Sequence, residues 1–165
     1  MTNMRDTRTK HYEVVHFYPG FDRQEFWDLF VDYESWSQSD MLPGEISVIE
    51  PGNGHPMGKG AVRSVVSGSM TITEDITGFQ PPVYFAYASR NGAMPVNDFV
   101  GELFLEQRAD GLVATYKAGF NPRYFGTGWL FRIMFRRAHR SFFRGLGRAY
   151  EARYGRPVAR SVRTA

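Results

Sequence analysis

The most regular pattern of apolar and polar positions lies in the last third of the chain, from Gly128 to Tyr154. Apolar residues recur there at steps of three and four, which predicts one long amphipathic α-helix. Because such a face must be covered, we expect the helix to lie on an apolar surface formed by the rest of the chain. The predicted apolar face consists of Phe131, Met134, Phe135, Ala138, His139, Phe142, Gly145, Leu146, Ala149 and Tyr150.

The preceding residues show the shorter, alternating pattern that is typical of β-strands. A first strand is expected at 10–18, followed by a short helix capped by Asp22, with Glu25 three positions later. A second helical turn is expected at 33–37. Turn residues then separate six further predicted strands, at 45–50, 59–67, 70–78, 83–90, 97–107 and 111–120.

This order of elements predicts an α+β helix-grip fold. In that fold a curved, seven-stranded antiparallel sheet carries two short helices and is covered by the long C-terminal helix. One helix does not fill the hollow of such a sheet, so we expect an internal cavity that binds a ligand. The 165 residues suit one domain, predicted at 10–154, with flexible tails at 1–9 and 155–165, the second of them basic.

One hairpin allows a prediction of side-chain positions. Gly68-Ser69 suits a two-residue turn, and this turn would place Arg63 opposite Glu74, with both side chains on the inner face. The pair then has two interpretations: an ion pair that holds the strand register, or a guanidinium that binds a carboxylate, phenolate or enolate of a ligand. A three-residue turn would instead send Arg63 to solvent.

Other polar side chains are candidates for the cavity. His139 lies on the apolar face of the helix between Phe135 and Phe142, where it is either a packed core residue or a proton-transfer group. Tyr87, Tyr116 and Asn97 are expected to reach inward and to orient a ligand, or simply to pack in the sheet. The predicted ligand contacts are therefore Arg63, Glu74, Tyr87, Asn97, Tyr116, Phe135 and Phe142, and the candidate catalytic residues are His139 and Arg63.

The three tryptophans have an expected structural role. Trp27, Trp36 and Trp129 are placed to brace the short helices and the start of the long helix, or to line the mouth of the pocket.

Charge is divided unequally along the chain. Residues 1–110 hold 8 basic and 16 acidic residues, whereas residues 111–165 hold 12 basic residues and 1 acidic residue. On the long helix, five arginines recur at four-residue steps: Arg132, Arg136, Arg140, Arg144 and Arg148. This ridge is either a solvated face that also attracts the acidic half, or a docking surface for RNA, an acidic protein or a membrane; no DNA binding is expected.

Several classes of protein are excluded by what the sequence lacks. It contains no cysteine, so it has neither disulfides nor a cysteine nucleophile. His, Asp and Glu show no metal-ligand spacing, and no signal-peptide pattern begins the chain, so we predict no metal, no cofactor and a cytoplasmic location. The oligomeric state stays open.

The ordered pattern of strands and turns resembles a known superfamily. The pattern consists of Gly60 and Arg63 in one strand, Gly68 in a turn, Glu74 in the next strand, then Pro81-Pro82, Tyr87, Gly101, Gly111 and Tyr116. With the long helix, it resembles the START-like (SRPBCC) superfamily over residues 10–154, especially the polyketide cyclase/dehydrase and lipid-transport branch. Members of that superfamily include lipid carriers, hormone receptors and aromatase/cyclases, so the resemblance implies the fold and leaves the activity open.

Two functions follow as hypotheses. The first is a carrier or binding protein that encloses an aromatic, polyketide-like or lipid-like ligand. The second is a polyketide cyclase, dehydratase or isomerase that uses orienting and acid–base groups in the same cavity. An adaptor that docks through the arginine ridge is a third alternative.

Overall fold

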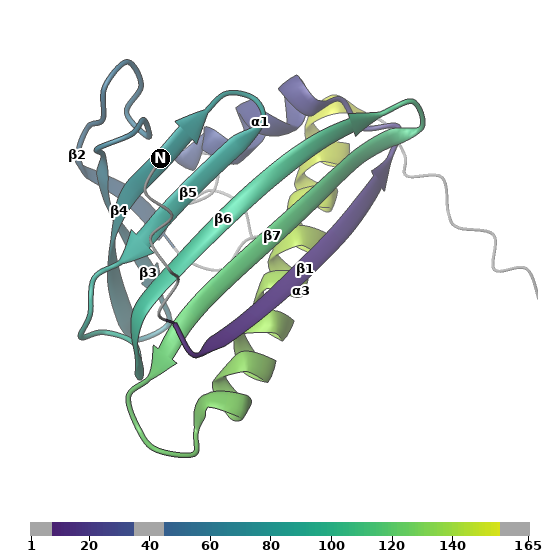
Figure 1. The fold of residues 1–165 in the computed structure, drawn as a ribbon. Helices are drawn as coiled ribbons and strands as arrows, with labels where there is room; N and C mark the ends of the chain where they lie inside the picture. Colours follow the sequence, from purple (N-terminus) through teal and green to yellow (C-terminus); the bar gives the residue numbers. More distant parts are fainter. Residues whose placement is uncertain (1–7, 35–44, 156–165) are drawn as a thin grey trace, which may run out of the picture.

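The computed structural model describes residues 8–34 and 45–155. The elements follow the expected order along the chain (Figure 1). They are β1 (Lys10–Pro19), α1 (Arg23–Val31), β2 (Glu45–Glu50), β3 (Val62–Ser67), β4 (Met70–Gln80), β5 (Tyr84–Ser89), β6 (Val96–Arg108), β7 (Gly111–Pro122) and α3 (Gly128–Tyr154).

The seven strands form one antiparallel sheet in the order β1-β7-β6-β5-β4-β3-β2. Strands β2 to β7 pair with their neighbours in sequence, whereas β1 crosses to the far edge and pairs with β7. Figure 1 shows α3 running along one face of this sheet, with α1 at one end. The predicted helix-grip fold is therefore confirmed.

The short helix α1 begins where the capping pattern places it. The side chain of Asp22 accepts hydrogen bonds from the backbone N–H groups of Gln24 and Glu25, at 2.8 and 3.0 Å. Of the second helical turn expected at 33–37, the structure describes Tyr33 and Glu34, which are helical; the rest lies outside the described residues. Trp36 and most of the two predicted tails also lie outside them.

The β3–β4 hairpin has the predicted two-residue turn. Gly68 adopts a φ of 60°, a left-handed conformation that glycine tolerates without steric cost. The turn pairs Arg63 with Glu74 and Val65 with Ile72. Arg63 and Glu74 are both buried, so the prediction of a charged pair on the inner face of the sheet is confirmed.

Helix α3 is packed unevenly along its length. In its C-terminal half, Phe143, Leu146 and Tyr150 are almost completely buried. In its N-terminal half, Phe131 and Phe135 are only partly buried, and Met134 is 50 % exposed. The predicted apolar face is thus a core element in its second half and a partial cover in its first half.

The C-terminal half of α3 is fastened to β1 and to the segment that follows it. The hydroxyl of Tyr18 donates a hydrogen bond to the backbone carbonyl of Phe143 at 2.7 Å, and the ring of Phe21 stacks on Tyr150 with 3.8 Å between centroids. Both ends of the domain therefore meet in one aromatic cluster.

The tryptophans only partly follow the sequence expectation. Trp27 is buried and packs edge-on against Phe79, as a bracing residue does. Trp129 is 62 % exposed, so the expectation that it braces the start of the long helix is wrong. The reason is its position on the helix: at about 100° per residue, Trp129 lies on the side of α3 turned away from the cavity-lining Phe135 and Phe142. Within the described residues, no helix has the length and apolar character needed to cross a membrane.

Candidate functional site

A cavity of about 360 Å³ lies between the sheet and the N-terminal half of α3. Its walls are mainly apolar and aromatic. On the helix side it is lined by Met134, Phe135, Ala138, His139, Phe142 and Phe143, and on the sheet side chiefly by Val65, Ile72, Phe85, Phe99 and Leu103. Met70 and Met134 both line the cavity and are partly exposed, which places its mouth between the β3–β4 hairpin and α3.

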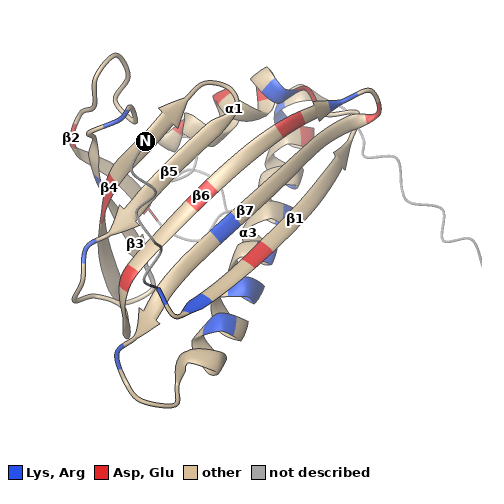
Figure 2. Ribbon diagram, viewed as in Figure 1, with Lys and Arg blue, Asp and Glu red and all other residues tan. Residues whose placement is uncertain are grey.

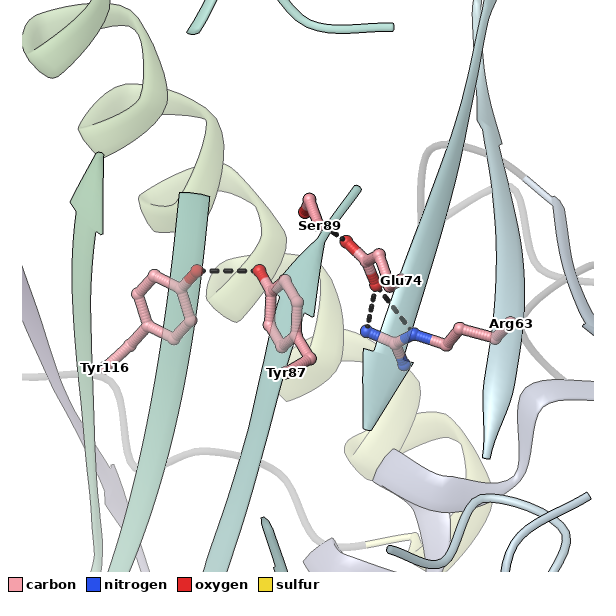
Figure 3. A network of polar contacts seen from close by, with 5 residues as sticks. All are labelled: Arg63, Glu74, Tyr87, Ser89 and Tyr116. Atoms are coloured by element: carbon pink, nitrogen blue, oxygen red, sulfur yellow. Dashed lines mark hydrogen bonds and ion pairs between the residues drawn. The ribbon is translucent and has the colours of Figure 1, made fainter. Parts of the chain in front are cut away.

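One wall of the cavity carries a buried ion pair (Figure 3). Arg63 on β3 donates from Nε and Nη2 to Oε2 of Glu74 on β4, with both distances 2.7 Å. The hydroxyl of Ser89 on β5 lies 3.4 Å from the other carboxylate oxygen, Oε1. The two-residue turn at Gly68 sets this register, so the local sequence directly produces the pair.

The guanidinium of Arg63 has further neighbours. Its central carbon lies 5.3 Å from the ring centroid of Phe85 and 5.2 Å from that of Tyr87, within the range of cation–π attraction. Its Nη1 atom is buried and has no hydrogen-bond partner among the described residues. A buried donor without a partner costs free energy, so an acceptor from a ligand would stabilise it.

A pair of tyrosines occupies the middle of the same wall (Figure 3). The hydroxyl oxygens of Tyr87 on β5 and Tyr116 on β7 lie 2.7 Å apart across β6. Gly101 on β6 leaves room for them, because a Cβ there would lie 2.7 Å from Cε1 of Tyr87 and in collision with the Tyr116 hydroxyl. Burial raises the pKa of both phenols, so both remain protonated at neutral pH.

His139 faces the cavity from α3. Its ring stacks on Tyr116 with 4.2 Å between centroids and 15° between planes. Its Nδ1 atom lies 3.0 Å from the hydroxyl of Tyr12 and 2.9 Å from the backbone carbonyl oxygen of Phe135. The Nδ1–H tautomer donates to that carbonyl, whereas the Nε2–H tautomer accepts from Tyr12. Burial lowers the pKa of His139 to about 4, so the imidazole is neutral at pH 7.

Asn97 is not among the residues that line the cavity. Its Oδ1 atom accepts a hydrogen bond from Arg123 at 3.4 Å, so the expectation that it reaches inward is wrong. The cause is a β-bulge: Asn97 pairs with Asn121 and Val100 with Gly119, so two residues of β6 lie opposite one of β7. The bulge reverses the alternation and turns Phe99 inward.

The structure therefore brings together most of the predicted site. Arg63, Glu74, Tyr87, Tyr116, Phe135, His139 and Phe142 all line one cavity. Sequence reasoning missed Ser89, which alternation along β5 from Tyr87 would have found. It also missed Tyr12, whose contact with His139 joins β1 to α3 and leaves no local signal in the sequence.

The arginine ridge lies outside the cavity. Figure 2 shows basic residues repeated along α3. Arg132, Arg136, Arg140, Arg144 and Arg148 are exposed, and none forms an ion pair within the part of the chain that the structure describes. The acidic half contacts the basic half elsewhere, for example through Asp32 and Arg153 at 2.8 Å.

Comparison with solved structures supports the fold. The Zhui aromatase/cyclase from a Streptomyces species superposes with a TM-score of 0.70 at 17% identity, covering 88% of this chain and 95% of that chain. For Ara h 8.0201 the TM-score is 0.69 at 14% identity, with 87% and 98% covered. For XoxI from Bacillus cereus it is 0.66 at 15% identity, with 86% and 96% covered. At these identities the likeness shows the fold alone.

Comparison of sequences places the chain in a family. A search of curated protein sequences found no match. A family model described as "Polyketide cyclase / dehydrase and lipid transport" matches residues 23–151, which include every residue of the cavity wall. Since this match spans most of the domain, the chain belongs to the polyketide cyclase/dehydrase and lipid-transport family of the START-like (SRPBCC) superfamily.

Proposed function

We propose that this protein binds a small hydrophobic ligand between the sheet and α3, as a carrier or binding protein. The observation that carries the proposal is the aromatic-walled cavity of about 360 Å³, which lies within the range of small-molecule sites. Apart from His139 on α3, its polar groups lie on the sheet wall, so they would orient one polar end of an otherwise apolar ligand. An aromatic, polyketide-like or lipid-like molecule meets this description.

The polar wall suits a ligand that carries a carbonyl or acidic oxygen. The hydroxyls of Tyr87 and Tyr116 lie 2.7 Å apart, with the Tyr12 hydroxyl also hydrogen-bonded to Tyr116, so this cluster would offer phenol groups to a ligand oxygen. Arg63 offers the Nη1 donors that have no partner among the described residues, and Glu74 holds the rest of the guanidinium in place. Phe135 and Phe142 would cover the apolar part of the ligand from α3.

The protonation states favour binding over acid–base catalysis. A pKa of about 4 leaves roughly one His139 imidazole in a thousand protonated at pH 7, so it is a poor acid, and it is also a weak base. The phenols, with raised pKa values, are poor acids as well. The cavity thus presents neutral hydrogen-bonding groups beside one compensated ion pair.

A cyclase, dehydratase or isomerase is the second candidate, because a histidine, two phenols and an arginine converge on one cavity. In that case Arg63 would stabilise an enolate oxygen, and His139 would accept the proton from carbon once the ligand had altered its surroundings. The family description and the Zhui aromatase/cyclase make this class of reaction the one to test. Unchanged turnover in a His139→Ala variant would remove His139 from that mechanism.

Native mass spectrometry of the protein from its own host tests the binding proposal. We expect a co-purifying small molecule whose mass appears only with the folded protein. Ala138→Trp should exclude this molecule, because Ala138 is exposed on the helix and lines the cavity. The matched control is Ala152→Trp, at an exposed position of the same helix outside the cavity, which should keep the ligand. Equal retention by both variants would contradict the proposed site.

A further inference from the structure

The loop after β7 and the first turns of α3 expose a dense group of large apolar side chains. The group, here called the helix–loop patch, consists of Tyr124, Phe125, Trp129, Leu130, Ile133 and Met134. Phe125 is fully exposed and Trp129 is 62 % exposed. The patch spans only eleven consecutive positions, at the end of the molecule where β7 leads into α3 (Figure 1).

The helical members of the patch lie side by side. At about 100° per residue, Trp129, Ile133, Leu130 and Met134 occupy a continuous sector of about 140° on α3. The next sector, through Phe135 and Ala138, lines the cavity. Met134 belongs to both, because it is half exposed and also lines the cavity. The patch therefore adjoins the cavity mouth.

Uncompensated positive charge surrounds the patch. Arg123, Arg132, Arg136 and Arg137 are exposed, and no ion pair among the described residues involves them. The sequence has no acidic residue between 111 and 150. Figure 2 shows this stretch of α3 with basic residues alone. The complementary surface is thus anionic and apolar at once.

We propose that the helix–loop patch docks on the surface of a lipid bilayer that contains anionic lipids. Trp and Tyr side chains prefer the interface between headgroups and acyl chains, and Phe, Leu and Ile insert just below it. The arginines would meet the anionic headgroups. In this orientation the cavity mouth lies next to the bilayer. Docking itself needs no ligand in the cavity, so it stands apart from the proposed function.

Two other occupants fit the patch less well. In a symmetric dimer each copy would present the same arginines to its partner, with no acidic residue of this stretch to neutralise them. RNA would match the arginines and stack on Trp129 or Phe125, but Leu130, Ile133 and Met134 offer no ring for a base. Only an anionic bilayer uses both the aliphatic and the cationic residues.

Vesicle flotation tests the proposal directly, with phosphatidylcholine vesicles and with vesicles of an equal mixture of phosphatidylcholine and phosphatidylglycerol. We expect strong binding to the anionic vesicles, weakened by added salt, together with a blue shift of tryptophan emission. The double substitution Phe125→Ser with Trp129→Ser should lower the affinity by about tenfold or more. Arg132→Gln with Arg136→Gln should abolish the preference for anionic vesicles.

The matched control removes exposed apolar side chains elsewhere. Val15→Ser with Phe17→Ser alters two exposed residues on the outer face of β1 and should leave vesicle binding unchanged. Light scattering and retention on single-stranded RNA complete the test. The proposal is overturned if the wild-type protein ignores anionic vesicles, if the patch variant binds them as well as the control does, or if only dimerisation or RNA binding responds to the patch variant.

Discussion

Arg63 and Glu74 form an ion pair in a mainly apolar wall, so each charge stabilises the burial of the other. Replacing Arg63 with Leu would leave the Glu74 carboxylate buried with the Ser89 hydroxyl as its remaining side-chain donor. We expect this change to lower the free energy of unfolding by about 3–5 kcal/mol, as measured by urea denaturation. Glu74→Leu should cost a similar amount, because it strands the guanidinium.

The double variant Arg63→Leu with Glu74→Leu is the control for this prediction. It removes both charges, so it should be considerably more stable than the sum of the single changes implies. Strict additivity of the two losses would show that the residues do not act as a pair. If the double variant also fails to bind the co-purifying ligand, the pair has a role in binding beyond holding the strand register.

The depressed pKa of His139 predicts a dependence of stability on pH. The unfolded state binds the proton near pH 6.5 and the folded state only near pH 4. The free energy of unfolding should therefore fall as the pH drops from 6.5 to 4, by up to about 3 kcal/mol, and change little from this source above pH 7. Thermal or urea unfolding across this range measures the slope.

A His139→Phe variant keeps an aromatic ring beside Tyr116 and removes the titrating group. It should flatten the slope between pH 6.5 and 4. Burial also lowers the pKa of His16, with a contribution from Arg144, so a His16→Phe variant measures the remaining slope of the same sign. If the wild-type protein and His139→Phe lose stability in parallel, His139 does not remain neutral in the folded state.

At the scale of single residues, local patterns predicted the site where the backbone is regular. Gly68-Ser69 defined the hairpin register, and the inward direction of Arg63, Glu74 and Tyr116 followed from it and from strand alternation. The prediction for Asn97 was wrong because a β-bulge begins at Asp98, which has a φ of 54°. No glycine or proline at this point of the sequence indicates the bulge. An extra residue in a strand reverses every later side chain, which alternation alone cannot foresee.

At the scale of elements, α3 has two different tasks. Its C-terminal half belongs to the core, and its N-terminal half covers a cavity and ends in the exposed helix–loop patch. The heptad-like pattern is continuous across both, so periodicity gave the limits of the helix correctly but not the difference in burial. That difference depends on how far the sheet extends beneath the helix.

Substitutions of two leucines in α3 would measure this difference in burial between its two halves. Leu146 is completely buried and Leu130 is 42 % exposed. Leu146→Ala should lower the free energy of unfolding by about 2–5 kcal/mol, whereas Leu130→Ala should change it by no more than about 0.5 kcal/mol. Both changes remove the same atoms from the same helix, so the urea midpoints compare packing alone. Similar losses at both positions would contradict the division of α3.

At the scale of the whole molecule, the order of elements was sufficient to predict the helix-grip fold, because only one long helix was available to cover the sheet. The identity of the proposed ligand does not follow in the same way. It depends on the shape that side chains from β3 to β7 and α3 leave between them, and contacts such as Tyr12 with His139 join residues more than a hundred positions apart.

The pairing of β1 with β7 has a consequence for how the protein folds during synthesis. Lys10 lies opposite Phe120 in the sheet, and the Tyr18 hydroxyl donates a hydrogen bond to the carbonyl of Phe143. The first strand therefore cannot pair until nearly the whole chain has been synthesised. Such distant contacts slow folding. During synthesis on the ribosome, the hollow face of β2 to β6 is complete before α3 has emerged. We therefore expect the nascent chain to pass through an interval with its aromatic interior uncovered, when a chaperone or the proposed ligand would have its earliest access to that surface.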